Sequence, residues 1–225
     1  MRELTADQTS HDERSPRPEY VSEVRLLHRY AGRTSVAIYR LFRRVWAKLF
    51  SWSTSGAFAS FGSGSVIQPP IRLTGERRIA VGKKVFIGAG SWLQVLERAE
   101  EGVALEIGDG TSIAGNCVFS AARSVRIGAR VLIARGVYIS DHSHAFEDTD
   151  RAVLDQGVTQ VDPVEVCDGA WLAEKVVIGP GVRVGRGTVI GANSVVLHDL
   201  PDHCVAVGAP ARVIRHLGVD ALPSA

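Results

Sequence analysis

The sequence predicts an all-β protein, a parallel β-helix built from six-residue repeats, with an α-helical extension at its N-terminus. Three observations support this prediction. From about residue 64, apolar side chains recur at every sixth position. The chain contains 23 glycines but only 7% aromatic residues, which suits tight corners around a narrow core. Residues 20–52 instead show the three- and four-residue spacing of a helix.

The N-terminal quarter is predicted to form a tail and a basic helix. Residues 1–19 are polar without periodicity and are expected to be disordered. Residues 20–56 read as a basic amphipathic helix and linker, with Gly32 as a potential break. Residues 20–52 hold seven basic groups against Glu23 alone. Two interpretations stay open: the helix packs on the main domain or a neighbouring subunit, or it lies on a membrane surface.

The six-residue repeat defines the main domain, predicted to span residues 57–215 and to be followed by a tail of residues 216–225. Gly or Ala usually follows the apolar residue, and a small or β-branched residue comes four positions after it. The repeated apolar positions are Val81, Ile87, Leu93, Ile107, Ile113, Phe119, Ile127, Ile133, Ile139, Val166, Leu172, Ile178, Val184, Ile190 and Val196.

A period of six fits neither a helix nor an ordinary amphipathic strand. It requires a short strand and a corner, repeated so that three repeats complete one triangular coil. The apolar side chain then points inward and stacks on its equivalent in the next coil, and each coil is stable only against its neighbours. We expect Gly or Ala at the following position to tolerate the bend.

Two segments interrupt the repeat. Residues 96–105 form a short charged insertion, expected to be an external loop. Residues 143–163 form a longer loop that protrudes directly after Asp141 and His142. A loop of this length in a compact repeat protein is functional or disordered, and its position beside these polar residues favours function.

Composition excludes several classes of protein. The net charge of +2 is too small to indicate a nucleic-acid partner. The first twenty residues lack the apolar region of a secretory signal, and no run of about 20 apolar residues is present. Three cysteines, without close pairing, predict neither a disulfide framework nor a zinc site. We therefore expect a cytoplasmic protein, at the inner face of the membrane if the basic helix binds there.

Two segments resemble a known family. The first is VLIARGVYISDHSHAFEDTD, and the second is PVEVCDGAWLAEKVVIGPGVRVGRGTVIGANSVVLHDLPDHCVAVGAPARVIR. Over residues 64–215 the chain resembles the left-handed β-helix acyltransferases, in the branch of galactoside, maltose and polysaccharide O-acetyltransferases. The resemblance implies a left-handed coil and transfer of an acyl group from acyl-CoA to a hydroxyl of a saccharide or glycoside.

The resemblance also implies the catalytic groups. His142 would deprotonate the acceptor hydroxyl, because imidazole is well suited to this role near neutral pH. Asp141 would fix the tautomer of that ring, and His144 is the reserve base or a substrate contact. The acyl group is acetyl by default, with medium chains such as octanoyl as an alternative. No tightly bound cofactor is expected, and acetyl-CoA or another acyl-CoA is a co-substrate.

In this family CoA lies between two subunits of a homotrimer. Matching positions assign the pantetheine side to small or polar residues and the phosphates to arginines, which carry a fixed charge. The chain departs from the family at His198, where the galactoside enzymes have lysine. It also departs at Ala114, which aligns with their acceptor-binding asparagine, and the nearby Asn116 is a loose substitute for that residue. The CoA candidates are Ala134, Ala173, Glu174, Ala192, His198, Arg212 and Arg215.

Parts of the sequence are also compatible with two other functions. A γ-type carbonic anhydrase uses the same repeat but needs three histidines around one metal, and His142 and His144 supply only two. His198, His203 and His216 are far along the repeat, so no metal site is predicted. A non-catalytic trimeric scaffold or membrane-surface protein would account for the basic helix but not for His142 and its loop.

Overall fold

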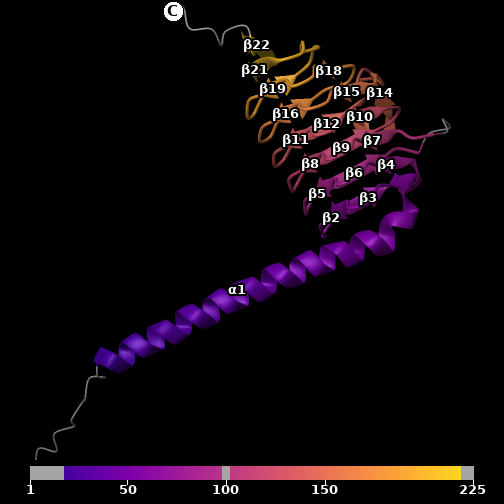
Figure 1. Cartoon of the computed structure of the whole chain (residues 1–225). Helices are drawn as coiled ribbons and strands as arrows, with labels where there is room; N and C mark the ends of the chain where they lie inside the picture. The colour runs from indigo at the N-terminus through magenta and orange to yellow at the C-terminus, as the bar shows by residue number, and fades with distance from the viewer. Residues whose placement is uncertain (1–17, 98–101, 219–225) are drawn as a thin grey trace, which may run out of the picture. The chain divides into compact units, whose positions relative to one another are not determined.

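The computed structural model describes residues 18–97 and 102–218 of the 225-residue chain (Figure 1). The chain divides into two compact units, Met1–Arg44 and Val45–Ala225. The first helix, α1 (Pro18–Thr54), is continuous through Gly32, so the potential break is not used. The predicted tail of residues 1–19 falls largely outside the described residues, as does most of the tail of residues 216–225.

Short strands form three parallel sheets that wind around a common core. Sheet 1 contains β1 (Ser60–Phe61), β4 (Ile79–Val81), β7 (Leu105–Ile107), β10 (Val125–Ile127), β15 (Val164–Val166) and β18 (Arg183–Val184). Sheet 2 contains β2 (Val66–Ile67), β5 (Phe86–Ile87), β8 (Ser112–Ile113), β11 (Leu132–Ile133), β16 (Trp171–Leu172), β19 (Val189–Ile190), β21 (Cys204–Gly208) and β22 (Ala211–His216). Sheet 3 contains β3 (Arg72–Thr74), β6 (Trp92–Val95), β9 (Val118–Ala121), β12 (Tyr138–Ser140), β17 (Val177–Ile178) and β20 (Val195–Val196).

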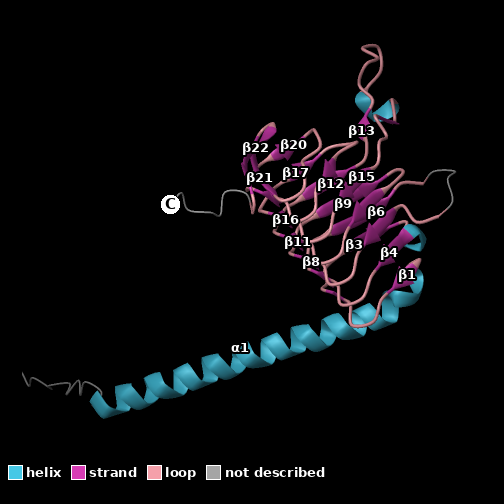
Figure 2. Ribbon diagram, turned by 45° about the horizontal axis from the view of Figure 1, so that its top comes forward, coloured by secondary structure: helices cyan, strands magenta, loops and turns pink. Residues whose placement is uncertain are grey.

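Successive strands of the chain belong to successive sheets, so each group of three strands makes one coil of a prism (Figures 1 and 2). This is the predicted left-handed parallel β-helix. The antiparallel pair β21 and β22 closes its C-terminal end. Short 3₁₀ turns, η1 (Ser55–Ala57) and η2 (Glu76–Arg78), lie near its N-terminal end.

The predicted apolar positions form the core. Ile87, Ile113, Ile133 and Leu172 occupy the same register on four neighbouring strands of sheet 2, and all four are buried. Equivalent ladders run along sheets 1 and 3, and every one of the predicted repeat positions is buried. The six-residue period therefore identified the inner face of each strand correctly.

The glycines that follow these apolar residues have a different role from the expected one. Gly82, Gly108 and Gly128 do not adopt left-handed backbone angles; the left-handed residues come two positions later, at Lys84, Gly110 and Arg130. A Cβ atom at Gly108 would lie 2.5 Å from the carbonyl carbon of Gly128 in the next coil. Glycine is therefore required because backbones of neighbouring coils approach closely at this corner.

Replacing Gly108 with alanine is expected to destabilise the prism by about 1–3 kcal/mol, because two backbone segments must move apart. Gly56 is the matched control, since nothing lies within 4 Å of a Cβ atom at that position. Thermal unfolding of both variants measures the effect. Equal melting temperatures for Gly108→Ala and Gly56→Ala would contradict the close-approach explanation.

The N-terminal unit boundary lies within α1, and the last turns of the helix pack on the prism. Ala47 and Ser51 are buried. The Ser51 hydroxyl donates to the carbonyl of Ala47 at 2.7 Å and accepts from the backbone N–H of Ile67 at 2.8 Å. Over the part of the chain that the structure describes, no helix is both long and apolar enough to cross a membrane.

The long interruption of the repeat is a hairpin-like excursion between β12 and β15 (Figure 2). It contains β13 (Ser143–His144), η3 (Val153–Asp155) and β14 (Val158–Thr159), with β13 and β14 antiparallel. At its base the carbonyl of Asp141 accepts from the backbone N–H of Asp162 at 2.8 Å. This bond brings the two ends of the excursion together, so its start is fixed on the rigid coil.

Candidate active site

Asp141 is a fully buried carboxylate at the corner between sheets 3 and 1. Its Oδ1 accepts from the backbone N–H of Ala122 at 2.7 Å. Its Oδ2 accepts from the backbone N–H groups of Arg123 and Ser124, each at 2.7 Å. These donors belong to the preceding coil, just after β9, so the carboxylate is held by main-chain atoms that cannot swing away.

The pKa of Asp141 is lowered from its ordinary value. Burial by itself raises the pKa of this carboxyl, but the hydrogen bond from His142 and those from the three amides favour the charged form and outweigh burial. Asp141 is therefore a carboxylate throughout the neutral range, with its lone pairs directed at fixed donors.

His142 follows immediately and lies against this carboxylate. Its Nδ1 is 2.8 Å from Oδ1 of Asp141, and 9% of its side chain is exposed. Because Asp141 is an acceptor only, this contact requires the proton of a neutral ring to be on Nδ1. The Nε2 atom then carries the free lone pair, which is the arrangement of a general base oriented by a carboxylate.

Ser140 fixes the backbone of the histidine. Its buried hydroxyl donates to the carbonyl of His142 at 2.8 Å and accepts from the backbone N–H of His142 at 3.2 Å. Neither Ser140 nor the three amides that hold Asp141 was singled out from the sequence. Ser140 ends β12 and looks like any other strand residue, so no sequence signal separates it from the repeat.

His144 is placed differently from His142. It lies in β13 and pairs with Val158 in the excursion, and it is exposed. It has no carboxylate contact comparable to that of His142 among the described residues. The geometry therefore favours His142 over His144 as the base.

The pantetheine candidates share one corner of the prism, between sheets 2 and 3. Ala134, Ala173 and Ala192 follow β11, β16 and β19 on three successive coils, and Glu174 is beside Ala173. The first two alanines are half-buried, and Ala192 and Glu174 are exposed. Asn116 is exposed at the same corner two coils before Ala173, in a left-handed conformation.

Arg212 and Arg215 are exposed on β22. Strict strand alternation would send side chains three residues apart to opposite faces. The register between β21 and β22 shifts by one residue, since Val213 pairs with Ala206 whereas Arg215 pairs with Val205. Ile214 is therefore the extra residue of a β-bulge, and the bulge returns Arg215 to the outer face that Arg212 occupies.

The remaining candidate, His198, is exposed after β20, at the corner between sheets 3 and 1. It thus shares a corner with His142, not with the pantetheine candidates. Within one chain the structure places the predicted site residues in two groups. Asp141, His142 and His198 lie at one corner, and the alanines, Glu174 and Asn116 lie at another. His144 on β13, and Arg212 and Arg215 on β22, belong to neither group.

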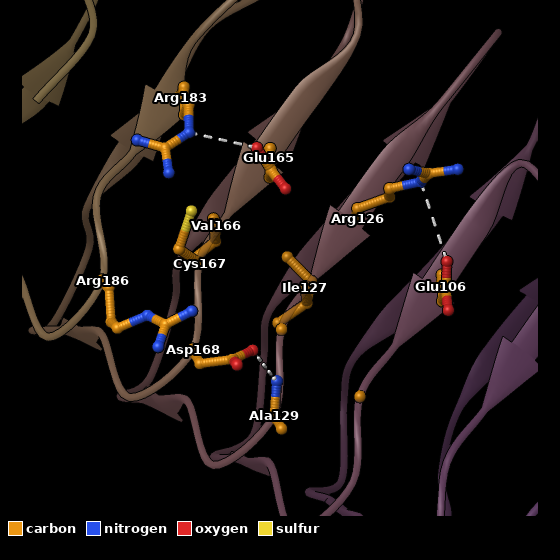
Figure 3. Close-up of a pocket in the computed structure, with 12 residues that line it drawn as sticks. Glu106, Arg126, Ile127, Ala129, Glu165, Val166, Cys167, Asp168, Arg183 and Arg186 are labelled. Carbon is orange, nitrogen blue, oxygen red and sulfur yellow. Dashed lines mark hydrogen bonds and ion pairs between the residues drawn. The ribbon is translucent and has the colours of Figure 1, made fainter. Parts of the chain in front are cut away.

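A groove of about 380 Å³ lies elsewhere, on the outer face of sheet 1 (Figure 3). Its acidic and basic groups alternate from one strand to the next across the sheet: Arg126 pairs with Glu106 at 3.7 Å, and Arg183 pairs with Glu165 at 3.2 Å. None of the predicted site residues lines it. Its exposed pairs neutralise one another, which leaves no excess charge for a phosphate group.

Within residues 18–97 and 102–218 of one chain, no group of three His, Cys, Asp or Glu residues is arranged to hold a metal ion. Among these residues, His142 and the exposed His144 have no third ligand beside them. The carbonic anhydrase alternative gains no support from this arrangement.

Comparison with known proteins identifies relatives of this chain. Residues 163–198 match the family model described as bacterial transferase hexapeptide (six repeats). Galactoside O-acetyltransferase of Escherichia coli (strain K12) is 33% identical over 144 residues, which cover 63% of this chain and 70% of that protein. A protein of Mycobacterium tuberculosis (strain ATCC 25618 / H37Rv), named a probable acetyltransferase, is 34% identical over 139 residues, 62% of this chain but only 44% of that protein.

Two solved structures that resemble this chain are also acetyltransferases. A hexapeptide-repeat acetyltransferase from Vibrio cholerae O1 biovar eltor, complexed with acetyl coenzyme A, superposes with a TM-score of 0.57 at 26% identity, covering 87% of this chain and 89% of that chain. A galactoside acetyltransferase in complex with coenzyme A gives a TM-score of 0.53 at 27% identity, covering 72% of this chain and 66% of that chain. The six-residue repeat, the parallel β-helix and the length over which these proteins match all indicate the same family. The chain thus belongs to the hexapeptide-repeat acyltransferase family, among the acyl-CoA-dependent acetyltransferases of the galactoside and maltose O-acetyltransferase kind.

Proposed function

We propose that this protein transfers an acyl group from acyl-CoA to a hydroxyl of a saccharide or glycoside, with His142 as the general base. The observation that carries the proposal is the contact of Nδ1 of His142 with the buried Asp141 carboxylate at 2.8 Å. It leaves Nε2 ready to accept a proton at the base of the excursion. A free hydroxyl is a weak nucleophile near neutral pH, so such a base is what the reaction needs.

In the proposed reaction Nε2 of His142 takes the proton of the acceptor hydroxyl while the oxygen forms a bond to the thioester carbonyl carbon. The carbon–sulfur bond then breaks, and the imidazolium returns the proton to the CoA sulfur. The products are an ester and free CoA thiol. Asp141 holds the ring in one tautomer and lies where it stabilises the positive charge that develops on the ring.

We further propose that the active site is shared between subunits of a homotrimer. The base and the predicted pantetheine residues lie at different corners of one prism, so a site that uses both sets requires a neighbouring copy. The outer face of sheet 2 supports such contact, because Phe86, Leu132 and Trp171 are exposed at the same register position, with Ser112 between Phe86 and Leu132. Exposed apolar ladders of this kind are typical of surfaces that bind a partner.

The phosphates of CoA are assigned to Arg212 and Arg215, which the bulge at Ile214 places on one face. Replacing either arginine with alanine is expected to weaken CoA binding by about 10- to 150-fold, since a charge-assisted hydrogen bond contributes about 1.5–3 kcal/mol. Isothermal titration calorimetry with CoA and with dephospho-CoA measures the loss. Arg77→Ala, at an exposed position in η2, is the control. Affinity equal to that of the parent protein would remove the arginine from the site.

The acyl donor and acceptor are tested together by measuring free thiol release. Purified protein is mixed with acetyl-CoA or octanoyl-CoA and a panel of mono- and oligosaccharides, and an amine acceptor is included for comparison. Thiol release that depends on a saccharide hydroxyl, together with an ester product, supports the proposal. Release that depends only on the amine would overturn the assignment of the acceptor class.

We place the enzyme in the cytoplasm. All three cysteines, Cys117, Cys167 and Cys204, are free thiols. Burial raises the pKa of the Cys117 thiol and, with a contribution from the nearby Glu165, that of Cys167. Protonated, unpaired thiols fit a reducing compartment.

A further inference from the structure

Helix α1 has an apolar face that nothing covers in the described chain. Helical geometry places six apolar side chains within about 100° of the helix circumference. These residues, named here the apolar face, are Ile38, Leu41, Phe42, Val45, Leu49 and Trp52. All six are exposed, with 79% of Trp52 accessible.

The apolar face is separate from the side of the helix that packs on the prism. In the last turns Ala47 and Ser51 are buried against the prism, and Phe50 is half-buried there. Val45, Leu49 and Trp52 belong to the same turns but are exposed. The prism therefore satisfies one side of these turns and leaves the apolar face free for another partner.

The charge of the helix decides which partner fits. Residues 24–54 contain seven basic residues and no Asp or Glu. Arg33, Arg40 and Arg44 lie on the side of the helix opposite the apolar face. Packing two copies through their apolar faces would leave the basic residues of both helices without an ion pair, because neither helix has a carboxylate in this segment. A surface of anionic lipid supplies both an apolar layer and negative charge.

Aromatic residues at the edges of the apolar face point to the same partner. Trp46 and Tyr39 are exposed on one side of it, and Tyr30 is exposed one or two turns before it. Trp and Tyr favour the level of lipid headgroups, where a ring meets apolar chains and a polar edge meets water. With the apolar face inserted, the arginines on the opposite side of the helix face the headgroup layer and water, where their long side chains attract lipid phosphates.

We propose that residues 28–52 of α1 form a docking surface for an anionic lipid bilayer, with the apolar face inserted among the acyl chains and the arginines at the phosphates. This surface is independent of the acyl-transfer site. Attraction of the basic residues adds roughly fivefold in affinity for each charge near the surface, from about 1 kcal/mol per Lys or Arg. Binding is therefore expected to depend strongly on lipid charge and on salt.

The test is co-sedimentation of the full-length protein with vesicles of phosphatidylcholine, with and without 30% phosphatidylglycerol. We expect at least about tenfold tighter binding to the anionic vesicles, and loss of most of that gain between 0.1 and 0.5 M salt. The double variant Arg40→Glu/Arg44→Glu should lose at least tenfold in binding. The control Arg77→Glu/Lys83→Glu makes the same charge change at exposed prism residues and should bind like the parent protein.

A second double variant, Leu41→Ser/Phe42→Ser, removes part of the apolar face without changing charge. It should also lose vesicle binding while keeping the melting temperature of the prism and thiol release with a water-soluble acceptor. Equal binding to both kinds of vesicle, or no effect of either helix variant, would overturn the proposal. A lower oligomeric state of Leu41→Ser/Phe42→Ser than of the parent protein, measured by analytical ultracentrifugation without lipid, would overturn it as well. The apolar face would then belong to a contact between subunits.

Discussion

Replacing His142 with alanine is expected to lower kcat/KM for acyl transfer by roughly 10²–10⁴-fold, the usual contribution of a general base. The Nε2 atom of this ring is the proposed proton acceptor, and the contact between Nδ1 and Asp141 leaves it free. Removing the ring takes away the group that deprotonates the acceptor hydroxyl and later protonates the CoA sulfur. CoA binding should change little, because the proposed pantetheine contacts lie at another corner of the chain and the phosphates are assigned to Arg212 and Arg215 on β22.

The measurement is initial-rate thiol release, with thermal unfolding recorded for the same sample. The loss should come from kcat, since the missing interaction belongs to the transition state. His144→Ala is the matched control, because this second histidine is exposed on β13. A full rate in His142→Ala, or a larger loss in His144→Ala, would move the base to the other histidine.

Replacing Asp141 with asparagine is expected to damage both activity and stability. The carboxylate accepts from three backbone amides and from His142, and an amide side chain has only one acceptor oxygen. If that oxygen faces Arg123 and Ser124, the new NH₂ group faces the amide of Ala122 and Nδ1 of His142. The ring must then carry its proton on Nε2, which removes the base. Activity should fall by at least about 10²-fold, as for other bases held in the wrong tautomer.

The stability of this variant should fall by about 2 kcal/mol at neutral pH, because a buried amide loses its acceptor. The pH dependence gives a second readout. The pKa of Asp141 is lowered in the folded protein by the hydrogen bonds that outweigh burial. Its stabilising contribution is therefore complete above the unfolded pKa of about 4 and is lost as the pH falls through the lower folded value. The melting temperatures of the parent protein and the variant should converge below about pH 4.

Nitrogen NMR of the imidazole reports the tautomer directly, with Nδ1 protonated in the parent protein and Nε2 protonated in Asp141→Asn. Asp168→Asn is a suitable control, since Oδ1 of Asp168 also accepts a corner amide, from Ala129 at 2.8 Å, but Asp168 is exposed and lies at the corner between sheets 1 and 2, a different corner from that of His142. Parent-like activity and an unchanged tautomer in Asp141→Asn would show that Asp141 only supports the fold.

The sequence predicted the core of this protein because the repeat is local. Each coil contributes one strand to each of the three sheets, and every strand repeats the same six-residue unit. A side chain six positions later therefore also points inward, and no long-range information is needed to identify Ile113 or Ile133 as buried. The reason for the glycines was different. Glycine is needed at position 108 because the backbone of Gly128 in the next coil lies close to it, and this contact forms only when the coils stack.

The candidate site shows the same division. The sequence by itself determined the repeat, the inner face of each strand, the excursion after Asp141 and His142, and the arginines of β22. Only the tertiary structure decided that amides of residues 122–124 hold the carboxylate and that the bulge at Ile214 places Arg212 and Arg215 on one face. It also placed His142, the proposed base, and the pantetheine candidates at different corners, because every corner of the prism always follows strands of the same sheet. Local periodicity encodes burial, whereas contacts between coils depend on how the chain is wound, and those contacts orient the chemistry.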